Sequence, residues 1–132
     1  MARTVATFLM FQNAVAEEAM ELYISLFSGS ELRSVERYGA GEEGAEGSVK
    51  RADFALDGHQ LICFDSPIEH DFSFTPSISL FVECDSEGEL DNAFEQLSAG
   101  GKVLMPLDDY GFSAKFGWVN DRFGVSWQLN LE

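Results

Sequence analysis

Apolar and polar residues alternate along the C-terminal segment of the chain, Val125-Ser-Trp-Gln-Leu-Asn-Leu131. A period of two is typical of a β-strand whose two faces meet different surroundings. The apolar residues form one face, which we expect to pack in the core. The other face carries Ser126, Gln128 and Asn130, whose side chains can only hydrogen-bond. This polar face is either exposed to solvent or the wall of a ligand cavity, and most of the functional question depends on which.

The first half of the chain predicts one helix among four strands. We predict a strand, a helix and three strands in the order Thr7–Phe11, 16–27, 31–38, 48–56 and His59–Asp65. Apolar residues recur at helical spacing in the second of these segments, and Asn13 precedes it as a candidate N-cap. Asp57-Gly58 is a dipeptide typical of a two-residue hairpin turn. The Gly- and Glu-rich segment 39–47 is expected to be a mobile loop.

The second half repeats this order after a linker at 67–76. A strand at 77–83 precedes a helix that opens with a Ser-x-x-Glu capping box, from Ser86 to Glu89, and ends at Gly100-Gly101. A strand at 102–105, a loop and two final strands follow, and a tight turn at 121–124 joins the last two. The pattern predicts an α+β fold of two βαβββ modules, about 1–66 and 77–132, in a single domain covering 1–132.

The composition is that of one globular domain, and it narrows the choice of partners. Of 132 residues, 45% are hydrophobic, which suffices for a core. Eight Lys and Arg stand against 23 Asp and Glu, and the formal net charge of −15 repels nucleic acid and anionic membranes. We therefore expect no nucleic acid and no membrane as partners. The N-terminal residues lack a secretion signal, so we expect a cytoplasmic protein in which Cys63 and Cys84 are buried free thiols.

The C-terminal turn and strand carry a family resemblance. The ending Asp121-x-Phe-Gly-x-x-Trp127 resembles the PhnB-like branch of the vicinal oxygen chelate superfamily, which includes glyoxalases, extradiol dioxygenases and bleomycin-resistance proteins. The segment 8–27 and the tripeptide Phe64-Asp65-Ser66 resemble the same branch. The resemblance implies a glyoxalase/bleomycin-resistance-like fold, in which two modules of curled mixed sheets form half-barrels whose concave faces enclose a site.

Some members of this branch bear the name 3-demethylubiquinone-9 3-methyltransferase. Adenosylmethionine enzymes of the common type use a strand, a Gly-rich turn and a helix within a parallel sheet. This chain is too short for that sheet, and its elements come in a different order. We therefore expect no adenosylmethionine binding.

The resemblance also implies where a metal would bind. Metal-dependent members of the superfamily place one ligand in the first strand and one in the last strand of each module, typically His, Gln or Glu. The corresponding positions here are Leu9 and Phe11, Ser79, and Gln128. Only Gln128 is a weak candidate ligand, because tight binding of a divalent ion needs several charged or imidazole donors. We expect no cofactor and a Gln128 that hydrogen-bonds a ligand or water, with a divalent metal as the alternative.

Asp65 is a further candidate, with two interpretations. The Asp57-Gly58 turn pairs Lys50 with Asp65 across the hairpin, which favours a surface ion pair. Alternatively, Asp65 lies at the mouth of the cavity and acts as an acceptor or a base.

The aromatic residues near the C-terminus also have two interpretations. Tyr110 and Phe112 either cap a pocket or pack down on a turn built on Gly111. Trp118 and Trp127 are expected to oppose each other across the final hairpin and to pack under a helix as core.

We predict a small-molecule-binding protein, or an enzyme of unknown reaction, with a metal-free cavity between half-barrels. Two alternatives remain: a metal-dependent lyase, isomerase or dioxygenase of the vicinal oxygen chelate type, and a drug-sequestering resistance protein. Half-barrels expose sheet edges and apolar surface that a second copy would cover, so we expect a homodimer. The candidate ligand-binding residues are Asp65, Tyr110, Phe112, Ser126, Gln128 and Asn130.

Overall fold

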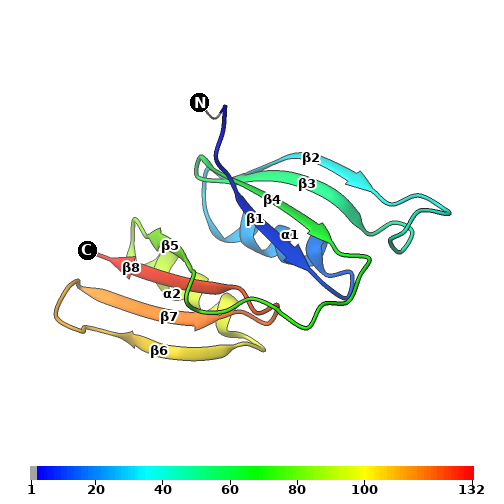
Figure 1. The fold of residues 1–132 in the computed structure, drawn as a ribbon. Helices are drawn as coiled ribbons and strands as arrows, with labels where there is room; N and C mark the ends of the chain where they lie inside the picture. The colour runs from blue at the N-terminus through cyan, green and yellow to red at the C-terminus, as the bar shows by residue number, and fades with distance from the viewer. Residues whose placement is uncertain (1–2) are drawn as a thin grey trace. The chain divides into compact units, whose positions relative to one another are not determined.

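The chain forms strands and two helices over residues 3–132, the residues that the computed structural model describes. In chain order (Figure 1) they are β1 (Thr7–Phe11), α1 (Ala16–Leu26), β2 (Glu31–Arg37), β3 (Val49–Leu56), β4 (His59–Asp65), β5 (Leu80–Glu83), α2 (Glu87–Ser98), β6 (Lys102–Asp108), β7 (Lys115–Asn120) and β8 (Ser126–Leu131). They divide into two compact units, Met1–His70 and Asp71–Glu132, which we call unit 1 and unit 2. Each unit holds one helix and a four-stranded mixed sheet, which confirms the predicted α+β fold of two βαβββ modules.

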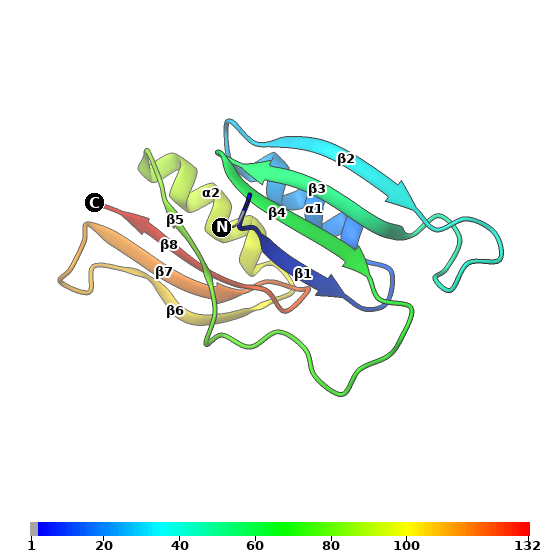
Figure 2. The same ribbon diagram turned by 45° about the horizontal axis from the view of Figure 1, so that its top comes forward.

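In unit 1, β4 lies between β1 and β3 at the centre of the sheet (Figure 2). The strand order is β1-β4-β3-β2, with β1 parallel to β4 and the other neighbours antiparallel. Leu56 pairs with His59, as a two-residue turn requires, and Asp57 and Gly58 both have positive φ angles, 47° and 87°. Helix α1 packs against β3 and β4. The fully buried side chains of this core include Phe11, Tyr23, Phe54 and Leu61.

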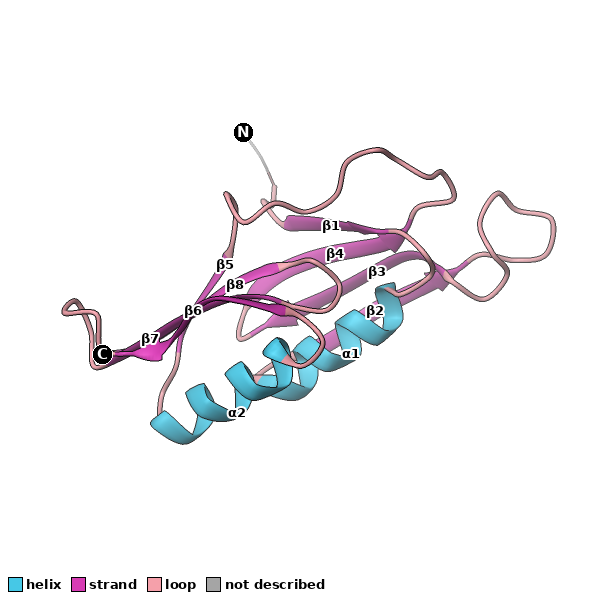
Figure 3. Ribbon diagram, turned by 90° about the horizontal axis from the view of Figure 1, so that it is seen from below, coloured by secondary structure: helices cyan, strands magenta, loops and turns pink. Residues whose placement is uncertain are grey.

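In unit 2 the strand order is β5-β8-β7-β6, with β5 parallel to β8. Figure 3 shows α2 lying along one face of this sheet, where it contacts β6, β7 and β8. Trp127 and Leu129 are fully buried there, as the alternation along the last strand predicts, and so is Val119 of β7. A Cβ at Gly117 would lie 2.6 Å from a ring carbon of Phe94. Glycine at this position therefore lets the helix approach the strand closely.

The two helices begin differently. Helix α2 starts as predicted, because the Ser86 hydroxyl accepts a hydrogen bond from the Glu89 amide at 3.1 Å. The Glu89 carboxylate in turn accepts one from the amide of Asp85, the residue before the cap, at 3.0 Å. The prediction that Asn13 caps α1 is wrong. The N-cap residue is Val15, whose side chain makes no capping hydrogen bond. Asn13 lies two residues earlier, with a φ of 71°.

The final hairpin corrects the predicted partners of the two tryptophans. Trp118 pairs with Gln128, and Trp127 pairs with Val119. The connection between β7 and β8 therefore shifts the register by one residue from our prediction. Because side chains alternate between faces, a shift of one residue moves Trp118 to the face opposite Trp127. Trp127 is core, as predicted, whereas Trp118 lies with the polar residues of β8.

Both cysteines are buried free thiols, as predicted. Burial raises the pKa of each thiol to about 12, so neither is a reactive thiolate at neutral pH. Among residues 3–132, no helix is long and apolar enough to cross a membrane.

Candidate functional site: the sheet face opposite the second helix

The polar residues of β8 lie on the face of the unit 2 sheet that α2 does not cover. Residues that pair directly across neighbouring strands share a face, so the register defines its membership. The residues of β5, β7 and β8 on it are Phe81, Glu83, Phe116, Trp118, Asn120, Ser126, Gln128 and Asn130, and Lys102, Met105 and Asp108 of β6 pair with residues of this face. We call this set the helix-free face of unit 2. It combines aromatic rings with short polar side chains.

Ser126 and Gln128 are joined to a serine from the segment before β5. The buried Ser126 hydroxyl accepts a hydrogen bond from the Trp118 indole nitrogen at 2.9 Å and forms another with the Ser79 hydroxyl at 2.7 Å. The Gln128 amide nitrogen donates to the Ser79 hydroxyl at 3.4 Å, which is long for a hydrogen bond. Ser126 is thus tied into the sheet, whereas Gln128 is held weakly and is half-buried.

Two side chains of this face, Asn120 and Asn130, carry a buried amide oxygen without a hydrogen-bond partner among the described residues, and Asn130 lies beside a carboxylate. The Asn130 side chain is 7% exposed, and its amide nitrogen donates to the Glu83 carboxylate at 2.9 Å. Its amide oxygen is buried and has no hydrogen-bond partner among the described residues. A buried acceptor left unpaired costs about 1–3 kcal/mol. Such an atom in a folded protein calls for an explanation, and a ligand that donates to it is one.

The loop between β6 and β7 carries both predicted aromatic candidates. Tyr110 and Phe112 contact the buried ring of Phe116, with centroids 6.1 Å and 5.1 Å from it. The Tyr110 hydroxyl donates to the Pro106 carbonyl at 2.5 Å. Gly111 has a φ of 96°, which favours glycine, so the turn is built on this residue. The two rings pack on Phe116, and Phe112 remains largely exposed.

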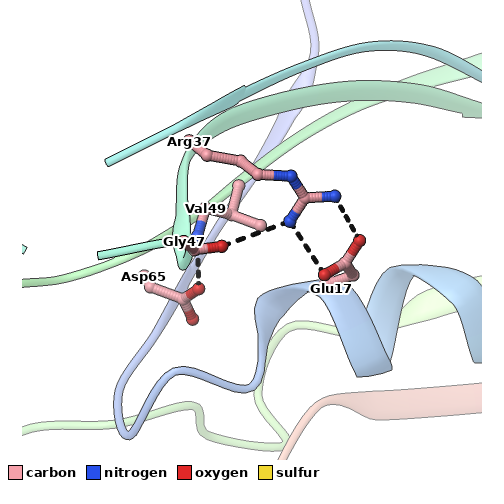
Figure 4. A network of polar contacts seen from close by, with 5 residues as sticks. All are labelled: Glu17, Arg37, Gly47, Val49 and Asp65. Carbon is pink, nitrogen blue, oxygen red and sulfur yellow. Dashed lines mark hydrogen bonds and ion pairs between the residues drawn. The ribbon is translucent and has the colours of Figure 1, made fainter. Parts of the chain in front are cut away.

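Asp65 lies in unit 1, and its side chain links the start of α1 to the start of β3. Its carboxylate accepts hydrogen bonds from the amides of Ala16 at 2.8 Å and Val49 at 2.9 Å (Figure 4 shows the second). The first amide opens α1, so Asp65 supplies the acceptor that Asn13 does not. The predicted ion pair between Lys50 and Asp65 is wrong: Lys50 pairs with Glu42 at 2.6 Å.

A second set of contacts in unit 1 closes the 39–47 loop. Arg37 makes a two-pronged ion pair with Glu17 and also donates to the Gly47 carbonyl at 3.2 Å (Figure 4). The Tyr38 hydroxyl donates to the Asp65 carbonyl at 3.0 Å, and burial, with the nearby Asp65 charge, raises the pKa of this phenol. Sequence reasoning missed this set because its members come from different elements and follow no local spacing.

The Asp-x-Phe-Gly-x-x-Trp ending is a structural device. The buried Asp121 carboxylate accepts hydrogen bonds from the Phe123 and Val125 amides and from the Trp127 indole nitrogen, at 2.9, 3.0 and 3.0 Å. Gly124 has a φ of 95°, which the tight turn requires. The motif therefore sets the β7–β8 connection, and through it the register that assembles the helix-free face.

The side chains at the expected metal positions do not fit a divalent ion. Leu9 and Phe11 are buried apolar residues. Ser79 and Gln128 do lie together, but they offer a hydroxyl and an amide. Within residues 3–132, no three His, Cys, Asp or Glu side chains form a group that could hold a metal ion. Zinc and manganese prefer imidazole, thiolate or carboxylate donors, which this set does not supply.

The structure thus gathers Ser126, Gln128 and Asn130 on one face and places Tyr110 and Phe112 on the aromatic cluster at its edge. It also adds Glu83 and Trp118, which sequence reasoning did not single out as ligand contacts.

Comparison with known proteins identifies relatives along nearly the whole chain. A family model described as 3-demethylubiquinone-9 3-methyltransferase matches residues 3–130. The PhnB protein of Bacillus cereus is 50% identical, with 98% of this chain and 100% of that one covered and a TM-score of 0.94. Protein PA1353 of Pseudomonas aeruginosa is 28% identical, with coverage of 99% and 98% and a TM-score of 0.83.

Two further relatives are more distant. Protein YjdN of Escherichia coli is 24% identical over 98 residues, which make up 74% of this chain and 66% of that protein. The fosfomycin resistance protein FosX of Listeria monocytogenes, solved with Mn(II), is 13% identical, with coverage of 98% and 93% and a TM-score of 0.59. At that identity the likeness concerns the fold alone.

Proposed function

Because the chain belongs to the 3-demethylubiquinone-9 3-methyltransferase family, in the PhnB-like branch of the vicinal oxygen chelate superfamily, we propose that it binds a small organic molecule on the helix-free face of unit 2. The observation that carries the proposal is the buried, unpartnered amide oxygen of Asn130. Ligand sites typically combine apolar and aromatic walls with a few polar groups that orient the ligand. Trp118, Phe116 and the exposed ring of Phe81 supply such walls beside Gln128 and Asn130.

A fragment screen followed by NMR tests this proposal directly. The full chain, labelled with ¹⁵N, is titrated with a library of aromatic fragments, and the shifted amides are mapped on the two units. We expect bound fragments to shift amides of β5, β7 and β8. The proposal would be contradicted if the fragments shifted amide signals of unit 1 only, or if no fragment shifted the amide signals of the helix-free face.

The family name includes a methyltransferase activity, but the structure gives no support for a site that binds adenosylmethionine. Both helix N-termini, the usual sites for an anionic cofactor group, are used by the chain itself: Asp65 binds the amide of Ala16, and Ser86 binds the amide of Glu89. The segment between β1 and α1, Gln12-Asn-Ala-Val15, contains no glycine to bring backbone close to a ligand. We expect calorimetry to detect no saturable binding of adenosylmethionine. Stoichiometric binding of adenosylmethionine would instead support a methyltransferase activity.

A metal-dependent lyase, isomerase or dioxygenase is the alternative activity. The amide and hydroxyl donors of the helix-free face argue against a tightly held divalent ion. Elemental analysis after mild dialysis is expected to find well under one zinc, manganese or nickel per chain. If the wild-type chain held one equivalent of metal ion and Gln128→Leu lost it, the metal-dependent enzyme would become the favoured function.

The remaining expectations concern assembly and location. The exposed apolar side chains of Phe8, Leu32 and Ile78 support a homodimer, because a partner copy would cover such surface. Sedimentation at micromolar concentration tests it, and a 14.6 kDa monomer throughout that range would contradict it. The cytoplasm is the compartment we propose for a chain with two buried free thiols.

A further inference from the structure

We infer that the ligand of the helix-free face carries a cationic nitrogen group, an amidinium or an alkylammonium, joined to a flat ring, and that Glu83 and Asn130 bind this group. The inference rests on the proposed function and narrows it to a class of ligand. Its starting point is the orientation of the Asn130 amide.

The Glu83 carboxylate determines which way the Asn130 amide points. The amide nitrogen donates to Glu83 at 2.9 Å. In the flipped orientation, two acceptor oxygens would face each other, which is unfavourable. The amide oxygen is therefore the atom left without a partner among the described residues, and it can only accept. A ligand atom that satisfies it must be a donor.

The two residues together favour a charged donor over a neutral one. Glu83 is paired with Asn130 in the β5–β8 register, so its carboxylate lies beside the unpaired amide oxygen. A group with several N–H donors and a positive charge can reach both acceptors at once. Hydrogen bonds of this kind are roughly twice as strong as neutral ones.

No side chain of the described part of unit 2 supplies that positive charge at this position. Unit 2 contains three basic residues against eleven acidic ones. Lys115 is paired with Glu87 and Asp91, on α2, and the Arg122 guanidinium lies over the Phe123 ring. Lys102 pairs with Asn120, which in turn pairs with Ser126, four residues from Asn130 and thus roughly 13 Å along the strand.

Aromatic rings lie next to the two acceptors. Phe116 pairs with Asn130 across β7 and β8, and Phe81 lies two residues before Glu83 on β5, beside Gln128 and on the same face. Phe81 is 59% exposed and so is available to a ligand. Ring faces attract cations and stack on flat rings, which favours an amidinium or alkylammonium joined to an aromatic ring over a purely aliphatic cation.

Three matched probes test the inference: benzamidine, benzamide and benzoate. They share a ring and differ in charge, from positive through neutral to negative. Each is titrated into the ¹⁵N-labelled full chain while the amides of Glu83, Cys84 and Asn130 are followed. We expect benzamidine to bind with a Kd about tenfold lower than that of benzamide, the ratio that one charge-assisted hydrogen bond supplies. Benzoate is expected to cause no shift.

Two variants that remove the same charge separate local recognition from the overall field. Glu83→Gln is expected to raise the Kd of benzamidine about tenfold, to the level of benzamide. Glu95→Gln removes an exposed carboxylate from α2, the other side of the sheet, and is expected to change the Kd less than twofold.

The outcomes are distinguishable from those of the proposed function. Equal binding of benzamidine and benzamide on this face overturns the inference and leaves the proposed function standing. Equal losses in Glu83→Gln and Glu95→Gln overturn it too, because they show a diffuse field. The inference is also overturned if other fragments shift the amide signals of this face and benzamidine does not. If no fragment of any kind shifts the amide signals of this face, the proposed function itself is wrong.

Discussion

The two units share a backbone plan but differ in the chemistry of one sheet face. In unit 1 the register places Met10 beside Phe64, and in unit 2 the corresponding strands place Glu83 beside Asn130. Two residue pairs earlier, on the same sheet faces, unit 1 has Phe8 beside Ile62, and unit 2 has Phe81 beside Gln128. Unit 1 therefore shows that this arrangement of strands needs no polar groups at these positions.

This difference is the strongest argument that the polar residues of unit 2 serve a ligand. The unit 1 side chains at these positions, Phe8, Met10, Ile62 and Phe64, contain no amide group, and the ring centroids of Phe8 and Phe64 are 5.3 Å apart. At the corresponding positions unit 2 carries the Asn130 amide oxygen, a buried acceptor without a hydrogen-bond partner among the described residues. A polar group that destabilises the fold where an apolar one is tolerated is best explained by function.

The largest effect is expected where the units agree rather than differ. Each has a buried carboxylate that accepts backbone amides, Asp65 in unit 1 and Asp121 in unit 2. Asp65→Ala leaves two buried N–H groups without an acceptor, so we expect the free energy of unfolding to fall by about 3 kcal/mol. Urea denaturation at pH 7 measures it. Asp71→Ala, at an exposed aspartate, is the control, and an equal loss in both variants would refute the structural role of Asp65.

A smaller effect, of opposite sign, tests the difference itself. Glu83→Met combined with Asn130→Leu gives unit 2 the apolar character that unit 1 has at the same positions. Removing both partners of a polar contact is neutral or stabilising, so we expect the free energy of unfolding to rise by up to about 1 kcal/mol. Benzamidine binding should disappear in the same variant. A loss of more than about 1 kcal/mol would mean that the pair holds the sheet together.

The smallest effect concerns the ion pair that closes the unit 1 loop. The hydrogen bond from Arg37 lowers the pKa of Glu17 below its ordinary value of 4.5. The stabilisation is therefore present above pH 4.5 and is lost as the pH falls through the lowered pKa. Both side chains are over two-fifths exposed, so the effect is small. Melting curves of wild type and Glu17→Gln should differ slightly at pH 7 and coincide at low pH. A difference that persists at low pH would show that the charge is not responsible.

The strands and the β3–β4 hairpin followed from local sequence patterns. Period-two alternation and the Asp57-Gly58 turn predict β3, β4 and their register, and the same alternation separates the core face of β8 from Ser126, Gln128 and Asn130. These features depend on residues close in sequence, so local rules suffice.

The errors came from contacts between distant residues and from one turn. Asp65 reaches Ala16 and Val49, 49 and 16 residues away, and no spacing rule predicts such a contact. The β7–β8 connection shifts the register by one residue, which moves Trp118 to the polar face. Glu83 was missed because the end of the predicted 77–83 strand, Leu-Phe-Val-Glu, shows no alternation of apolar and polar residues; the strand itself is shorter, Leu80–Glu83.

Paired glutamine variants test the central claim that unit 2, and not unit 1, binds the ligand. Gln128 lies on β8, and Gln60 lies on β4, the matching strand of unit 1, and both are half-buried. Aromatic fragments selected on the wild-type chain are titrated into Gln128→Leu and Gln60→Leu, and their Kd values are measured by NMR. The account predicts that Gln128→Leu weakens binding about fivefold or more, the loss of roughly one hydrogen bond, while Gln60→Leu leaves it unchanged. Equal effects of the two variants, or a loss only in Gln60→Leu, would contradict it.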